Sequence, residues 1–156
     1  MASKYSQAMD QEPEQARDYL RSKLPVIGVG NIDLQHRQLL DHIVDFHALV
    51  EQLLKQRPDD QTWAEIQSHF DFLFRYIREH LAYEEQLMES NNYIGFEAHK
   101  REHEDFAKKV ESFKRDLLDK QDIYATVNVK FFLLDWLFSH TNNTDVQLKG
   151  MRMKNL

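Results

Sequence analysis

Apolar residues recur along most of the chain with the three- and four-residue steps that are typical of amphipathic α-helices. A first helix is predicted to begin at Asn31 or Asp33, either of which is a suitable N-cap. It is expected to run to about Arg57, because Pro58 follows. The same spacing predicts three further helices, at about residues 62–89, 96–119 and 122–141.

The connections between these predicted helices are short, which places consecutive helices side by side and antiparallel around a shared core. The chain has only four glycines and three prolines, which is sparse punctuation for a β-rich protein with many turns. We therefore predict an all-α fold, an antiparallel up-and-down four-helix bundle.

Three parts are expected along the chain: an N-terminal extension over residues 1–24, the helical domain over 25–150 and a C-terminal tail over 151–156. The extension is polar and charged. Pro13 suits the first turn of a short helix that runs through Leu20. A loosely ordered extension fits the same residues equally well.

Composition narrows the class of protein. A chain of 156 residues fits a single core, and 42% hydrophobic with 12% aromatic residues argues against disorder. The formal net charge of −6 disfavours binding to nucleic acid, which requires a basic face. The absence of cysteine excludes disulfides, thiolate metal sites and cysteine catalysis.

The N-terminal residues lack the apolar core of a secretory signal, and the chain has no apolar run long enough to span a membrane. The simplest expectation is a soluble, cytoplasmic protein without a membrane partner.

Polar residues occupy several positions on the predicted apolar stripes, where the helical period demands hydrophobic side chains. Burying one polar group without a partner costs roughly 1–3 kcal/mol. A single such residue is usually a hydrogen-bonded core histidine, and several in register could hydrogen-bond to one another. A shared metal ion, however, satisfies imidazoles and carboxylates together. The residues on the stripes are His80, Glu84, His99, His103 and His140.

These positions lie at the same level along the bundle axis and also face its interior. Two pairs of them are four residues apart, so each pair lies on one face of its helix. The start of the first helix, which carries His36, lies level with the ends of the second and fourth helices and with the start of the third. We therefore predict one metal site at this end of the bundle.

Asp145 follows His140 by five residues, which on a straight helix rotates it about 140° away. A local unwinding of the polar segment between them, residues 141–144, could return its carboxylate to the site. Three histidines, His42, His47 and His69, are interpreted as structural or surface residues. The last two lie eleven residues from the nearest predicted ligand on their helices, about 16 Å along the axis.

Four segments of the chain resemble the hemerythrin family, particularly its bacterial members. They are Ile32–His36, His80–Glu85, His99–His103 and His140–Asp145, and the resemblance covers about residues 25–150. It implies a dioxygen-binding protein with two non-haem irons in the chain. Many bacterial members carry a tryptophan before the first histidine, where this chain has an apolar run from Leu24. That departure bears on pocket shape and ligand access rather than on the metal site.

The resemblance also implies a role for each predicted ligand. One iron would be held by His99, His103 and His140; the other by His36 and His80, with an open position; Glu84 and Asp145 would bridge both, together with a solvent-derived oxo or hydroxo group. Trp136 and Leu137 lie one turn before His140 and are candidates for an apolar wall of the oxygen pocket. Ordinary core packing is an equally good interpretation of Trp136.

Reversible dioxygen binding for storage, transport or buffering is the leading functional hypothesis. Five neutral imidazoles and two carboxylates donate less electron density than the carboxylate-rich di-iron sites that favour O–O cleavage. The alternative is an oxygen or redox sensor that signals to a partner or a fused domain through residues 1–24 or the basic tail that begins at Lys149. A di-iron oxidase or peroxidase is disfavoured, because no acid–base pair beyond the ligands and no organic substrate pocket are evident, so we do not expect an enzyme.

Overall fold

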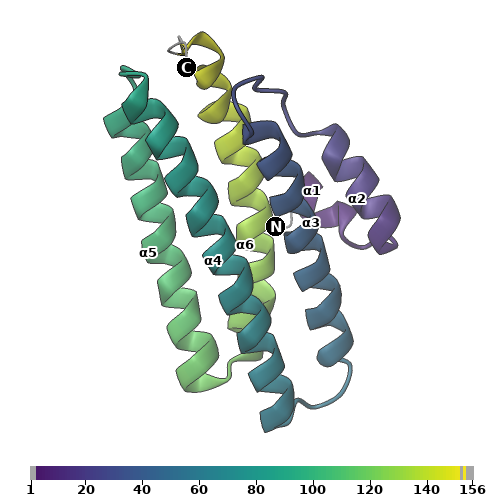
Figure 1. The fold of residues 1–156 in the computed structure, drawn as a ribbon. Coiled ribbons are helices and arrows are strands. Elements are labelled where there is room, and N and C mark those ends of the chain that lie inside the picture. Colours follow the sequence, from purple (N-terminus) through teal and green to yellow (C-terminus); the bar gives the residue numbers. More distant parts are fainter. Residues whose placement is uncertain (1–2, 152, 154–156) are drawn as a thin grey trace.

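Four long helices lie side by side in the computed structural model, which describes residues 3–151 and 153, apart from the side chains of residues 117–119 (Figure 1). Each long helix contacts two others, so the four close into a bundle, and no strand occurs among the described residues. The predicted all-α, up-and-down four-helix bundle is therefore confirmed. The long helices are α3 (Ile32–Leu53), α4 (Asp60–Ser90), α5 (Phe96–Lys120) and α6 (Ile123–Asn143).

Local sequence explains where these helices begin and end. The Asp59 carboxylate caps α4 by accepting a hydrogen bond from the Thr62 amide at 2.8 Å, and Asp122 caps α6 in the same way. Helix α3 ends at Leu53, four residues before its predicted end at Arg57. The predicted end was too late: Pro58 disfavours the helical conformation at Arg57 only, and the α-helical pattern is already lost at Lys55, whose amide bonds to the Gln52 carbonyl three residues before it at 3.5 Å.

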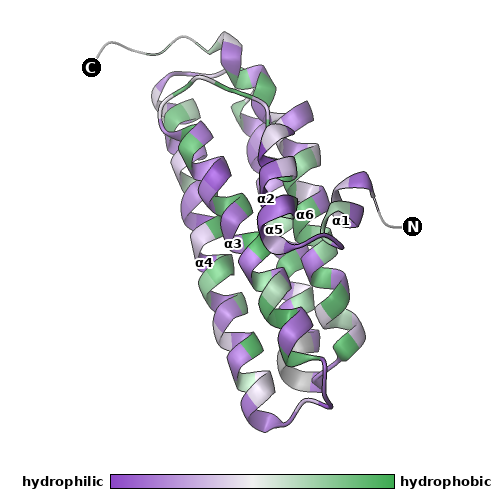
Figure 2. Cartoon of the chain, turned by 90° about the vertical axis from the view of Figure 1, so that its right-hand side faces the viewer, coloured by the Kyte–Doolittle hydropathy of each residue, from purple (hydrophilic) through white to green (hydrophobic). Residues whose placement is uncertain are grey.

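The apolar stripes of the four helices meet in one core. Figure 2 shows hydrophobic and hydrophilic residues alternating around each long helix, as the spacing predicts. Leu39, Ile66, Val110 and Leu133, one from each helix, are at most 1% exposed. A second, smaller apolar cluster covers the end of the bundle where α3 begins and α4 ends; it contains Ile27, Val29, Ile32, Met88, Leu148 and Met151.

The N-terminal extension is helical and lies against the bundle. Pro13 is the first residue of α2 (Pro13–Ser22), which packs on α3 with Leu20 fully buried. Of the two interpretations of this segment, the helix is therefore the one observed. Both ends of the Arg21 guanidinium fork donate to the Asp41 carboxylate, at 3.2 and 2.6 Å, which joins α2 to α3.

A shorter helix, α1 (Lys4–Ala8), packs on the outer side of α6. The ring of Tyr5 stacks on that of Phe138, with centroids 4.1 Å apart. The hydroxyl groups of Ser3 and Ser6 both donate to the Asp135 carboxylate. The extension therefore contacts the helix that carries His140.

Two contacts hold the segment that leads into α3. The Asp33 carboxylate accepts hydrogen bonds from the amides of Ile27 and Gly28, at 2.7 and 2.8 Å. Gly30 has a φ of +50°, and a Cβ there would lie 2.6 Å from the Tyr83 hydroxyl oxygen, so a glycine is required. These contacts fix the first turn of α3, which directly precedes His36.

After α6 the chain turns into a 3-10 helix, η1 (Asp145–Gly150). The C-terminal tail expected over 151–156 falls largely outside the described residues, which omit 152 and 154–156. None of the described helices is long and apolar enough to cross a membrane.

Candidate metal centre

The seven side chains predicted as ligands converge at the end of the bundle where α3 and α5 begin and α4 and α6 end. Each is at most 4% exposed, although all seven are polar. They form two groups of potential ligand atoms that share one carboxylate: Glu84, His99, His103 and His140 in the first, and His36, His80, Glu84 and Asp145 in the second.

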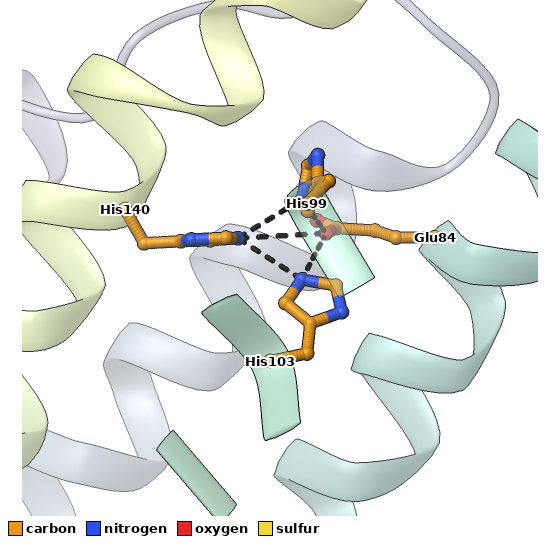
Figure 3. A group of neighbouring side chains, drawn as sticks. All are labelled: Glu84, His99, His103 and His140. Carbon is orange, nitrogen blue, oxygen red and sulfur yellow. Dashed lines mark hydrogen bonds and ion pairs between the residues drawn. The ribbon is translucent and has the colours of Figure 1, made fainter. Parts of the chain in front are cut away.

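In the first group, which we call the three-histidine cluster, the imidazoles of α5 and α6 point at one another (Figure 3). The Nε2 atom of His140 lies 3.1 Å from the Nε2 atoms of both His99 and His103. Glu84 directs Oε2 to the same place, 3.3 Å from each of those two nitrogens. The two contacts of His140 Nε2 cannot both be good hydrogen bonds, because a single ring nitrogen of a neutral imidazole carries either one N–H or one lone pair.

In the second group, which we call the two-histidine cluster, α3 and α4 supply the imidazoles. Glu84 Oε1 lies 2.9 Å from the Nε2 atom of His80 and 3.3 Å from that of His36. Asp145 Oδ2 lies 3.0 Å from the Nε2 atom of His36. This cluster has one imidazole fewer than the other.

Both carboxylates lie between the two clusters. Glu84 directs Oε1 to the two-histidine cluster and Oε2 to the three-histidine cluster. Asp145 directs Oδ2 to His36 and Oδ1 to His99 and His140, at 3.0 and 2.9 Å. A carboxylate with one oxygen toward each of two sites can bridge two cations.

The residues present fit a pair of metal ions. Glu84 Oε2 and both oxygens of Asp145 are buried without a hydrogen-bond partner, which is costly for a carboxylate unless a cation is bound. Two ligand atoms about 2.1 Å from one ion and at right angles to each other are about 3.0 Å apart. The observed separations of 3.1 Å between ring nitrogens match that value. Imidazole and carboxylate are also the ligands that iron accepts.

Burial and the close approach of opposite charges shift the pKa values of the site in opposite directions. Burial alone would lower the pKa of His36 and His140, but the carboxylates of Asp145 and Glu84, joined at His140 by Glu102, lie close enough to outweigh it and raise those values to about 9 and 11. Burial would raise the pKa of Asp145 and Glu84, yet the surrounding histidines hold both well below their ordinary range. The clusters therefore favour positive charge beside two ionised carboxylates, and a bound cation would supply that charge in place of protons.

Three of the imidazoles also make a contact through Nδ1, the ring nitrogen that faces away from the clusters. The residues that make these contacts were not predicted from the sequence. Each of these residues directly precedes or follows a predicted ligand in the chain, which turns it about 100° away on a helix. Only the packing of neighbouring helices brings it against a different ligand. The contacts join the Nδ1 atoms of His80, His103 and His140 to the side chains of Gln35, Glu85 and Glu102.

Trp136 and Leu137 lie beside the site in different ways. The Trp136 indole stacks on the His140 ring, with centroids 4.3 Å apart and planes 13° apart; the rings of Phe106 and His103 also lie beside it, at 3.8 and 6.5 Å. Leu137 is 1% exposed and belongs to the core. Trp136 therefore packs directly on a predicted ligand, and it is half-buried.

The three remaining histidines belong to neither cluster. His42 lies edge-on to the rings of Phe72 and Tyr76, and His69 is exposed. His47 is buried, and burial lowers its pKa to about 4.

A helical bundle with five buried histidines around two shared carboxylates defines a dinuclear metal protein. Residues 27–151 match the family model described as the hemerythrin HHE cation-binding domain. The chain therefore belongs to the hemerythrin family, whose members bind dioxygen at a non-haem di-iron centre. The resemblance inferred from the four ligand segments is confirmed.

Individual relatives support this assignment. The chain is 34% identical to a bacteriohemerythrin of Stenotrophomonas maltophilia over 76% of its length and 71% of that protein. It is 30% identical to a bacteriohemerythrin of Pseudomonas paraeruginosa over the same shares. It is 38% identical to a hemerythrin of Sipunculus nudus, over 54% of its length and 64% of that protein. No solved structure gives a significant match.

Proposed function

We propose that this chain binds dioxygen reversibly at two non-haem irons and serves to store, transport or buffer it. The observation that carries the proposal is the pair of buried clusters that share Glu84, with Asp145 directed to both. Two sites at this separation suit a ligand that takes up electrons from two irons together.

In this proposal the ligands divide as the contacts do. His99, His103 and His140 would hold one iron and His36 and His80 the other, with Glu84 and Asp145 available to both. The iron with two histidines has fewer protein ligands and keeps a position for dioxygen. When bound, the two irons would supply the electrons for oxygen binding, and the protein supplies their position and a closed environment.

The surroundings of the site support reversibility. Trp136 and Leu137 place apolar surface beside His140, and the ligands themselves are at most 4% exposed. Restricting water and protons at the site slows loss of the bound oxygen. We therefore assign these two residues to the wall of the oxygen pocket.

Metal analysis and absorption spectroscopy test the proposal. We expect two irons per chain, and a visible absorption that appears when the reduced protein meets dioxygen and disappears when dioxygen is removed. His99→Ala should lower iron occupancy, whereas His69→Ala, an exposed histidine on α4, should leave it unchanged. Irreversible conversion of the reduced protein to the ferric state within seconds would contradict a carrier role.

Hemerythrins are oxygen-binding proteins rather than enzymes, and we propose the same for this chain. Sustained turnover of peroxide with common electron donors would contradict this assignment.

A sensor is the second candidate, and the contact between α1 and α6 favours it. Ser6 of α1 donates to Asp135 at 3.2 Å, and Asp135 is five residues before His140 on the same helix. A shift of α6 on oxygen binding would therefore reach the extension. Protease cleavage in the α1–α2 connection should then differ between deoxygenated and oxygenated protein; identical cleavage would argue for storage or transport alone.

A further inference from the structure

The two clusters differ in the residues that contact the Nδ1 atoms of their histidines. In the three-histidine cluster, two of the three imidazoles contact a carboxylate through Nδ1. His103 Nδ1 lies 3.2 Å from Glu85 Oε2, and His140 Nδ1 hydrogen-bonds to Glu102 Oε2. Glu102 is itself held in place, because the Thr144 hydroxyl donates to its other oxygen at 3.0 Å.

Among the described residues, no such carboxylate contacts an Nδ1 atom of the two-histidine cluster. His80 Nδ1 donates to the side-chain oxygen of Gln35 at 2.7 Å, and an amide carries no charge. The Nδ1 atom of His36 is buried and has no hydrogen-bond partner. Two anionic partners therefore serve one cluster, and one neutral partner serves the other.

This difference affects metal affinity. A histidine that donates its outer N–H to a carboxylate is fixed in the tautomer that presents Nε2 to the metal, and its Nε2 donates more electron density. Hydrogen bonds to an ionised acceptor are roughly twice as strong as those to a neutral one. Removing such a partner typically costs about 10–100-fold in metal affinity.

We propose that the chain loads its two metal ions in order, the three-histidine cluster first, and that Glu85 and Glu102 are the positioning residues that set this order. The inference rests on the proposed function only in that both clusters bind a metal ion. The two-histidine cluster, which keeps the position for dioxygen, is the weaker site and the last to fill. A chain with one ion is then a defined intermediate that has the three-histidine site occupied.

Titration of the metal-free protein with Co²⁺, followed by its visible absorption against a competing chelator, tests the order without any measurement of oxygen binding. We expect two resolved binding steps. His140→Ala should remove the tight step, and His36→Ala should remove the weak one. A single step with equal affinities in the unaltered chain would overturn the proposal.

Isosteric variants test the role of the carboxylates. Glu85→Gln and Glu102→Gln should each weaken the first step about 10–100-fold and leave the second nearly unchanged. The reverse change, Gln35→Glu, should strengthen the second step. Glu104→Gln, an exposed glutamate on α5, is the matched control and should change neither.

The outcomes separate this inference from the proposed function. If both ions bind in order but Glu85→Gln and Glu102→Gln leave the first step unchanged, the positioning role is wrong and the metal site stands. If the folded chain, checked by circular dichroism, binds no Co²⁺ in either step, the proposed function itself fails.

Discussion

A buried ion pair far from the metal centre offers a sharp test of how this bundle tolerates charge in its core. The side chain of Lys130 on α6 is 1% exposed, and its ammonium group donates to the carboxylate of Glu51 on α3. The Glu51 side chain is 60% exposed. Replacing Glu51 should therefore lower the free energy of unfolding much more than replacing Lys130.

Glu51→Gln leaves a buried ammonium without a counter-charge. Removing one partner of a buried pair costs about 3–5 kcal/mol, and water reaching the open side of Glu51 should reduce that to about 2–3 kcal/mol. Lys130→Met strands no buried charge, because the Glu51 carboxylate returns to water, so we expect a loss below about 1 kcal/mol. The free energy of unfolding of the double variant should be close to that of Lys130→Met alone, which implies a coupling energy of about 2–3 kcal/mol.

Urea unfolding at neutral pH, with all variants at equal metal content, measures these differences. In a thermal scan the single Glu51→Gln change should lower the Tm by about 4–12 °C. The exposed pair of Lys114 and Asp71, 3.0 Å apart, is the matched control, and Asp71→Asn should cost less than about 1 kcal/mol. Equal, additive losses in Glu51→Gln and Lys130→Met would refute the reasoning.

Three further predictions concern the rest of the fold. The pKa of His47 is about 4 in the folded chain and 6.5 ordinarily, so between these pH values the unfolded chain binds more protons than the folded chain. The free energy of unfolding should therefore fall by up to about 3 kcal/mol as the pH drops through that window. In His47→Leu this fall should be absent when unfolding is measured across the same pH range. Gly30→Ala should destabilise by about 1–3 kcal/mol more than Gly28→Ala in urea unfolding, because both have positive φ but only the first places a Cβ against the Tyr83 hydroxyl; equal losses would contradict this contact. Removing metal with a chelator should lower the Tm, and restoring it at a thousand times its Kd should return about 4 kcal/mol of stability; an unchanged Tm would mean that the folded chain does not bind metal preferentially.

The sequence was sufficient to predict the helices and the height at which the polar residues meet, since both follow from periodicity. His80 and Glu84 interrupt an otherwise apolar stripe, and such an interruption is visible without a structure. Asp145 was less accessible to the same reasoning. Its position depends on α6 ending at Asn143 and on the change to a 3-10 helix, which helical spacing does not predict.

The residues behind the ligands and the docking of the extension could not be predicted, because both depend on contacts between distant segments. Glu102 belongs to α5 but contacts a histidine of α6, and its own spacing marks it as a solvent-facing residue. Tyr5 and Ser6 lie in a short polar segment with no strong period, so their contacts with Phe138 and Asp135 of α6 could not be predicted from spacing. The spacing of apolar residues describes one helix at a time, whereas these contacts depend on how two helices pack against each other.

The stacking of Trp136 on His140 gives the chain a built-in optical reporter. A paramagnetic ion held by His140 would lie within one imidazole of the indole and quench its emission. The second tryptophan, Trp63, is at the start of α4, seventeen residues and about 25 Å along the axis from His80. Fluorescence from Trp63 should therefore persist as an internal reference while that of Trp136 follows metal loading, so occupancy of the three-histidine cluster can be monitored without a label.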